Sequence, residues 1–103
     1  MPLYLIERNY AEKLEADPYK VGRILDTNKE TGVHWLFSFL SADRRKTYCL
    51  YEAPNPEAIR EAARRLDIPA DVIIEVSEVN PSMYLSAEEV TARSGHSPAT
   101  AIG

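Results

Sequence analysis

Two side chains of this 103-residue sequence can do chemistry that few of its other residues can do. Cys49 is the only cysteine, and His34 is one of two histidines. An imidazole can bind a metal ion or transfer a proton near neutral pH, and a thiolate can bind a metal ion or act as a nucleophile. Together the two residues predict a transition-metal site.

The spacing of the possible ligands adds little support for such a site. The sequence has no CxxC, HxxxH or HExxH pattern. A site within one chain would need carboxylates such as Glu7 or Glu52, unless a second subunit supplied the missing ligands. The structural alternative is that Cys49 is a buried small hydrophobe and that His34 is satisfied by a neighbour. His96 lies in a polar tail and is expected to be solvated.

The segment that holds both residues is expected to form a β-hairpin. Residues 33–41 and 45–52 are typical of strands, and the polar sequence SADRRK between them favours a turn. A turn centred on Asp43 and Arg44 fixes the register of the two strands. The opposed pairs are then Ser38 with Cys49, Leu36 with Tyr51, and His34 with Ala53.

Alternation of side chains divides this hairpin into two faces. The strongly apolar set, expected to lie under the helices, is Val33, Trp35, Phe37, Phe39, Tyr48 and Leu50. The mixed set, expected to be uncovered, is His34, Leu36, Ser38, Thr47, Cys49 and Tyr51. The two reactive groups therefore share a face without being opposed, so they are not expected to touch. The residues expected to line a ligand pocket on that face are Tyr4, Arg8, Ser38 and Tyr51.

Caps and turn residues define the first strand and the first helix. Residues 2–10 are short and apolar, as is typical of a strand. Asp17 is a good N-cap, Pro18 suits the first helical position, and Gly32 is a good stop signal. Gly22 within this helix suggests that the helix lies close to the sheet.

The second half of the chain repeats this pattern. Asn55 and Pro56 begin a second helix. The apolar stripe of this helix is Ile59, Ala62, Ala63 and Leu66. Residues 71–79 alternate in the manner of a fourth strand, and Ser86 with Glu89 predicts a capping box for a short C-terminal helix.

The predicted order βαββαβ is that of a ferredoxin-like α+β fold, an antiparallel sheet with two helices on one face. Residues 1–79 form this domain, and residues 80–103 form an extension with a short helix and a loose tail. The second face of the sheet is left for water, a ligand or a partner chain.

Composition excludes several function classes. The net charge of −4 does not suit a general nucleic-acid binder, which needs a basic surface. No apolar run reaches the roughly 20 residues of a membrane span, and no signal peptide is recognisable. A single cysteine suits the reducing cytoplasm. A chain this short is expected to enclose a large ligand cavity only as a homodimer.

Several stretches resemble a family of small bacterial proteins of unknown function, some of which are described as nickel-binding. They are YLIER, GVHWLFSFLSADRRKTYCLYEAPNPEAIREAA and IPADVIIEV, within residues 2–79. The most specific run is D-x-x-K-x-x-C-x-Y-x-A-P-x-P-E-A, from Asp43 to Ala58. The resemblance implies a ferredoxin-like domain that dimerises through sheet faces and binds nickel or another divalent transition metal. Only His34 and Cys49 match positions that suit ligands.

We therefore predict a small cytoplasmic, homodimeric binding protein that holds a metal ion or a small ligand on the open sheet face. In this hypothesis His34 and Cys49 are the metal ligands. The alternative is a cofactor-free dimeric α+β-barrel enzyme, of the isomerase or monooxygenase type, that acts on a small hydrophobic substrate. There His34 would be the acid–base group and Tyr51 would orient the substrate. A third hypothesis is an interaction module whose open face only dimerises.

Overall fold

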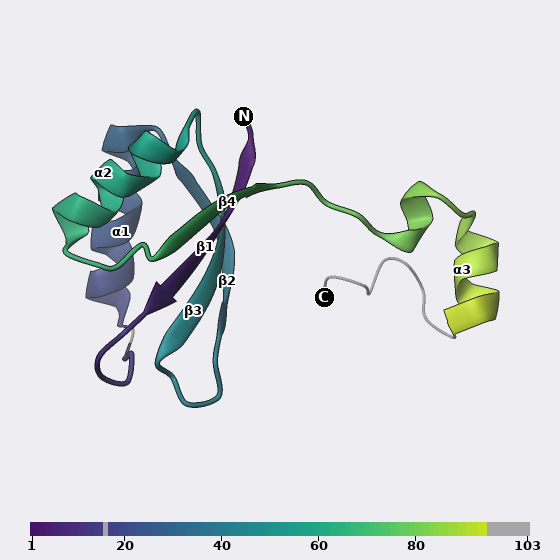
Figure 1. Cartoon of the computed structure of the whole chain (residues 1–103), viewed down its shortest axis with the longest axis horizontal. Coiled ribbons are helices and arrows are strands. Elements are labelled where there is room, and N and C mark those ends of the chain that lie inside the picture. The colour runs from purple at the N-terminus through teal and green to yellow at the C-terminus, as the bar shows by residue number, and fades with distance from the viewer. Residues whose placement is uncertain (16, 95–103) are drawn as a thin grey trace.

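The computed structural model describes residues 1–15 and 17–94 of the chain. The strands are β1 (Leu3–Asn9), β2 (His34–Leu40), β3 (Lys46–Glu52) and β4 (Val72–Val76). The helices are α1 (Pro18–Thr31), α2 (Pro56–Leu66), the 3-10 helix η1 (Pro81–Met83) and α3 (Ala87–Ser94). The sheet order is β2-β3-β1-β4 with antiparallel neighbours throughout. The predicted ferredoxin-like topology is confirmed (Figure 1).

The predicted helix caps are also confirmed. The Asp17 side chain accepts a hydrogen bond of 2.8 Å from the Lys20 amide at the start of α1. Gly32 ends that helix in the left-handed region, with a φ of 76°. The Asn55 side chain accepts a bond of 2.9 Å from the Ala58 amide at the start of α2. Local sequence therefore sets where each helix begins.

The register of the hairpin agrees with the prediction only near the turn. Ser38 lies opposite Cys49, as predicted. A β-bulge between Trp35 and Phe37 then shifts the pairing by one residue, because Leu36 has no partner on β3. The pairs beyond the bulge are His34 with Glu52 and Trp35 with Tyr51, and the predicted pairs His34–Ala53 and Leu36–Tyr51 are wrong.

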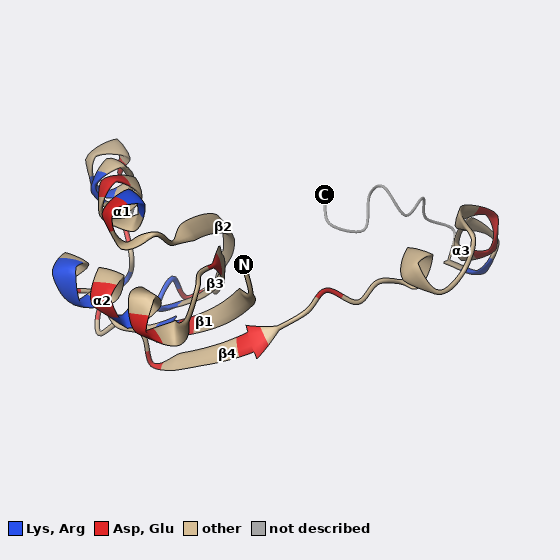
Figure 2. Ribbon diagram, turned by 90° about the horizontal axis from the view of Figure 1, so that it is seen from above, with Lys and Arg blue, Asp and Glu red and all other residues tan. Residues whose placement is uncertain are grey.

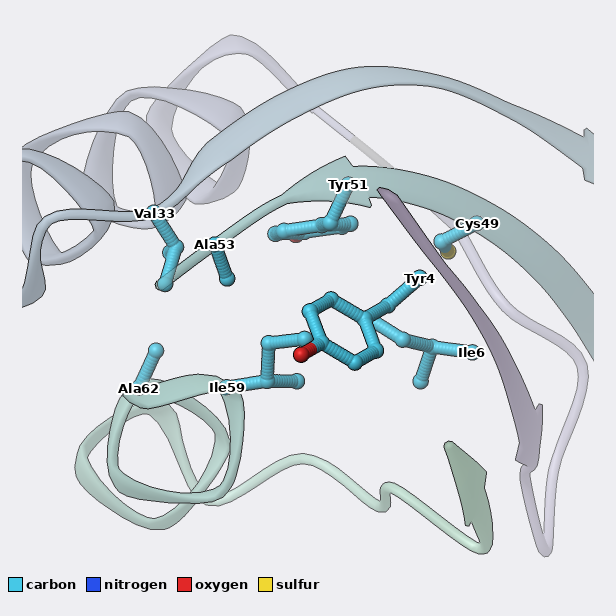
Figure 3. Close-up of a cluster of buried hydrophobic side chains, with 8 residues drawn as sticks. All are labelled: Tyr4, Ile6, Val33, Cys49, Tyr51, Ala53, Ile59 and Ala62. Carbon is cyan, nitrogen blue, oxygen red and sulfur yellow. The ribbon is translucent and has the colours of Figure 1, made fainter. Parts of the chain in front are cut away.

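The assignment of the two sheet faces was wrong for most of the hairpin. The β3 residues that lie buried on the helix-covered face are Thr47, Cys49 and Tyr51. They pair with the buried β1 residues Arg8, Ile6 and Tyr4. The residues that lie on the uncovered face instead are Phe37, Phe39, Tyr48 and Leu50. Pairing with β1 explains the error: it turns alternate residues of β3 toward the core cluster (Figure 3).

The two helices lie on the same side of the sheet but pack to different degrees (Figure 2). Helix α2 buries Ile59, Ala62 and Ala63, whereas α1 buries only Asn28. A Cβ placed on Gly22 would meet no atom within 4 Å. The expected close approach of α1 to the sheet at Gly22 is therefore absent.

The C-terminal segment leaves the sheet earlier than predicted, because β4 ends at Val76 and not at residue 79. The chain then runs away from the domain to η1 and α3 (Figure 1). The Glu89 amide donates a hydrogen bond of 3.2 Å to the Ser86 hydroxyl, and this bond is one half of the predicted capping box. No helix in the described part of the chain is both long enough and apolar enough to span a bilayer.

Candidate functional site

A cavity of about 440 Å³ lies between α1 and the covered face of the sheet. The residues of α1 that line it all lie in the N-terminal half of that helix. Its apolar walls are Tyr10, Leu14, Val21, Ile24, Trp35, Leu40, Leu66 and Ile68. A sizeable pocket was expected between two copies, and this one, which is partly open to solvent, is lined by residues of a single chain.

The segment between β1 and α1 closes one end of this cavity. The Tyr10 amide donates a hydrogen bond of 2.8 Å to the Arg45 carbonyl, and the Leu14 amide donates one of 2.7 Å to the Arg44 carbonyl. Arg44 returns a bond of 3.2 Å from its Nε to the Leu14 carbonyl. These bonds fasten the segment to the β2–β3 turn, so Tyr10 and Leu14 are held where they line the cavity.

The β-bulge determines which side chains of β2 reach the cavity. Because the bulge adds one residue, Trp35 and Ser38 both lie on the covered face although they are three positions apart. The Trp35 indole donates a hydrogen bond of 2.8 Å to the Ser38 hydroxyl. The bond orients both side chains in the cavity wall.

The polar side chains in the wall are Arg8, Lys20, Arg23, Ser38, Thr47, Cys49 and Tyr51. Arg8 is only 3% exposed. Its Nη1 donates a hydrogen bond of 2.5 Å to the Pro69 carbonyl, and its guanidinium lies 5.8 Å from the centre of the Tyr51 ring. Within the described residues Arg8 makes no ion pair with a carboxylate.

Tyr51 is the titratable group next to this guanidinium. Burial raises the pKa of the Tyr51 phenol, while the Arg8 charge and the Asn28 amide act in the opposite direction. The phenol is protonated at neutral pH and can donate a hydrogen bond. The side-chain amide of Asn28 is itself buried, and its Nδ2 and Oδ1 form no hydrogen bond of normal geometry among the residues described.

Cys49 behaves as a buried thiol and not as an exposed nucleophile. Its side chain belongs to the core cluster, and its Sγ donates a bond of 3.5 Å to the Thr47 hydroxyl. Figure 3 shows Cys49 beside Tyr4, Ile6 and Tyr51. A thiol in this position contributes a small, weakly polar patch to the cavity wall.

The four residues predicted to line a pocket do not all lie in the same place. Arg8, Ser38 and Tyr51 line the cavity, under the helices and not on the open face where they were expected. Tyr4 lies outside this lining, in the core beside α2. Burial raises the pKa of the Tyr4 phenol, and the charges of Glu75 and Glu57 add to the effect.

The two predicted metal ligands lie on opposite faces of the sheet. Cys49 lines the cavity, whereas His34 is exposed and pairs with Glu52 on the uncovered face. The prediction that they share a face was wrong, and one metal ion cannot reach both within a chain. The same separation keeps His34 and Tyr51, the two residues named in the enzyme hypothesis, apart within one chain.

The residues of one chain do not fit a bound nickel ion. Among residues 1–15 and 17–94, no three His, Cys, Asp or Glu side chains gather closely enough to hold a metal ion. The guanidinium of Arg8 stands beside the Cys49 cavity and repels a divalent cation. The predicted loose tail began at Arg93, but Arg93 and Ser94 belong to α3, and the rest of it, with the remaining histidine His96, lies outside the described residues.

Sequence reasoning missed the part of the wall that α1 provides. Val21 and Ile24 line the cavity from α1, together with the basic residues Lys20 and Arg23. The available signal was Asn28, a polar residue at helical spacing within the short apolar stripe of α1. It indicated that this helix does not pack as a regular apolar face.

The uncovered face of the sheet is the second notable surface. Its exposed apolar side chains are Phe37, Phe39, Tyr48, Val72 and Ile74. Phe37 and Phe39 form an edge-to-face pair with ring centres 5.6 Å apart. Phe39 is 65% exposed and Ile74 is 51% exposed. His34 and Glu52 lie on this same face as cross-strand neighbours.

The topology and the cavity define a ferredoxin-like α+β domain of a kind compatible with a small binding protein. The chain belongs to the SCO4226-like family, whose sequence profile is described as "Nickel responsive protein SCO4226-like" and matches residues 4–76. The crystal structure of SCO4226 from Streptomyces coelicolor A3(2) is similar, with a TM-score of 0.65 and 22% sequence identity. The match covers 76% of this chain and 99% of that chain, and at this identity it shows the fold. No curated protein matches the sequence.

Proposed function

We propose that this protein binds a small organic molecule in the cavity between α1 and the sheet. The observation that carries the proposal is the cavity itself, whose volume of about 440 Å³ falls within the range of known ligand sites. Apolar walls with a few converging polar groups are the usual composition of such sites. Arg8, Ser38 and Tyr51, three of the four residues expected to bind a ligand, support it.

A neutral, apolar fluorescent dye tests the proposal. We expect N-phenyl-1-naphthylamine to bind the wild-type protein and to become brighter in the apolar cavity. Val21→Trp fills the cavity from α1 and should weaken binding by about tenfold, since filled volume excludes the dye. Leu25→Trp is the matched control, because Leu25 is on the same helix, is 51% exposed and does not line the cavity. Equal binding by both variants would contradict the proposal.

We also propose that two copies associate through their uncovered sheet faces. The exposed row of aromatic and aliphatic side chains supports this, because monomeric proteins rarely leave a contiguous apolar patch of this kind in water. A two-fold dimer is the commonest way to cover such a patch. The single cysteine, which is free and buried, supports the predicted location in the reducing cytoplasm.

Sedimentation of charged variants tests the dimer. Phe39→Glu and Ile74→Glu place a carboxylate in the proposed interface, and each should convert a dimer into a monomer. Tyr84→Glu is the control, because Tyr84 is 73% exposed on the C-terminal segment, away from the sheet. A wild-type monomer would contradict the proposal, and so would a dimer that only Tyr84→Glu disrupts.

Nickel binding between two copies is a second candidate function. The observation that favours it is the pairing of His34 with Glu52 on the proposed interface, in a family described as nickel responsive. Two such pairs facing each other would supply four ligands of the imidazole and carboxylate type. Titration calorimetry with nickel chloride should show binding that His34→Ala and Glu52→Gln abolish. Cys49→Ser should leave it unchanged, and loss of binding in that variant would contradict this assignment.

A further inference from the structure

The charged residues of the cavity all have the same sign. The protein has a net charge of −4, yet the charged side chains in the cavity lining are Arg8, Lys20 and Arg23. No aspartate or glutamate of residues 1–15 and 17–94 lines it. The lining of the cavity in this acidic protein therefore carries cations and no carboxylate among the described residues.

Arg8 differs from the arginines on the surface in being buried. Arg60, Arg64, Arg65 and Arg93 each form an ion pair with a glutamate, although all four are well exposed. Arg8 is almost fully buried and has no such pair within the described part of the chain. Burying a cation without a counter-charge is costly, so the missing ion pair matters more at Arg8 than at the exposed Arg23, Arg44 and Arg45, which also lack one within the described residues.

Arg8 has more donors than its bonds to the Pro69 carbonyl and the Tyr51 hydroxyl use, and it lines the cavity. A guanidinium carries five N–H groups, and Arg8 spends one nitrogen on the Pro69 carbonyl. The Tyr51 phenol beside it adds a further donor, and the Ser38 hydroxyl lines the same cavity. Planar oxyanions such as carboxylates and sulfonates are the groups that a guanidinium binds with two parallel hydrogen bonds.

We infer that the cavity binds a monoanion with an apolar body, and that Arg8 binds its anionic group while the α1 side of the wall holds the apolar part. This inference rests on the proposed function, because it names the class of ligand for the same cavity. Lys20 and Arg23, on α1, attract the anion toward the cavity. A free metal cation is excluded from this site by the same three charges.

A pair of dyes that differ by one anionic group tests the inference. 8-Anilino-1-naphthalenesulfonate has the aromatic body of the neutral N-phenyl-1-naphthylamine and adds a sulfonate. We expect the sulfonate to bind the wild-type protein about tenfold more tightly, because hydrogen bonds to a charged group are worth at least that factor. Arg8→Met should abolish the roughly tenfold preference for the sulfonate over the neutral dye, and this ratio is read from the two dyes on the same variant.

A second variant keeps the test decisive if Arg8→Met does not fold. Arg23→Gln removes an exposed cation of the lining and should weaken only the sulfonate, by about two- to threefold and less at high salt. Lys29→Gln is the control, because Lys29 lies at the other end of α1 and outside the lining.

The possible failures of the two proposals can be told apart. Equal affinities of the two dyes, or a preference for the sulfonate that a folded Arg8→Met keeps, would overturn the inference and leave the cavity as a binding site. Absence of binding by both dyes would overturn the proposed function itself.

Discussion

Helices α1 and α2 occupy corresponding places in the βαββαβ order, but they differ in the side chains that they bury. Helix α2 buries three apolar side chains against the sheet, whereas α1 buries one, and that one is the polar Asn28. Both helices start at a side-chain cap followed by proline. The difference therefore arises from the residues along each helix and not from how the helix is initiated.

The contrast explains how a small domain holds a cavity. Residues of α2 with small side chains, Ala62 and Ala63, let that helix lie close to the sheet beside Ile59. Helix α1 places Val21 and Ile24 at the edge of an open space. Helix α2 thus completes the core, whereas α1 buries fewer side chains and borders the cavity.

The largest expected effect separates the cores under the two helices. Ile59→Ala should lower the free energy of unfolding by about 2–5 kcal/mol, because it empties a fully buried site. Ile24→Ala should cost about 1 kcal/mol, because Ile24 is half-buried beside an existing cavity. Urea unfolding of both variants measures the difference. Equal losses would mean that α1 packs as tightly as α2.

The caps allow each helix to be weakened separately. Asp17→Ala and Asn55→Ala should each cost about 1 kcal/mol in unfolding experiments, since each removes a hydrogen bond at a helix start. Only Asp17→Ala should also weaken binding of N-phenyl-1-naphthylamine, because the first turns of α1 line the cavity, whereas α2 contributes only Leu66 at the end far from Asn55. A loss of dye binding in Asn55→Ala would show that the cavity depends on both helices.

The fold could be predicted from local sequence signals. Asp17, Gly32 and Asn55 mark helix boundaries through interactions within a few residues, and the structure confirms them. The strand order follows from element order and from the small number of allowed topologies. Such features depend on neighbouring residues in the chain, which a single sequence displays.

The faces of the sheet could not be predicted in the same way. Both faces of the β2–β3 hairpin carry aromatic residues, so apolar character does not tell which face lies under the helices. The bulge at Leu36 shifts the register, and no glycine or proline in that part of β2 signals it. Arg8, Ser38 and Tyr51 do line one cavity, but it lies on the covered side of the sheet and not on the open face where they were expected.

A smaller effect on stability is expected at Gly22, and its sign tests whether α1 is packed against other residues there. Gly22→Ala should stabilise the protein by about 0.5–1 kcal/mol, because a Cβ there enters open space and alanine favours the helix. Gly32→Ala is the contrasting variant, since its φ of 76° strains any residue with a Cβ and should make it destabilising. A destabilised Gly22→Ala, measured by thermal unfolding, would mean that α1 approaches the sheet more closely than the structure shows.

The smallest effect concerns the surface of α2, where Glu61 accepts hydrogen bonds from Arg64 and Arg65. Bonds from Arg64, then from Arg65, lower the pKa of the Glu61 carboxyl to about 2. A lowered pKa stabilises the fold above the ordinary value of 4.5, and this contribution is lost as the pH falls toward about 2. The wild-type urea midpoint should fall between about pH 5 and about pH 2, because the Glu61 carboxylate takes up its proton in roughly that window. In Glu61→Gln this fall should be smaller. Glu57→Gln, which removes the longer 3.6 Å pair with Arg60, is the control, and an equal flattening there would mean that the bonds around Glu61 add nothing to α2.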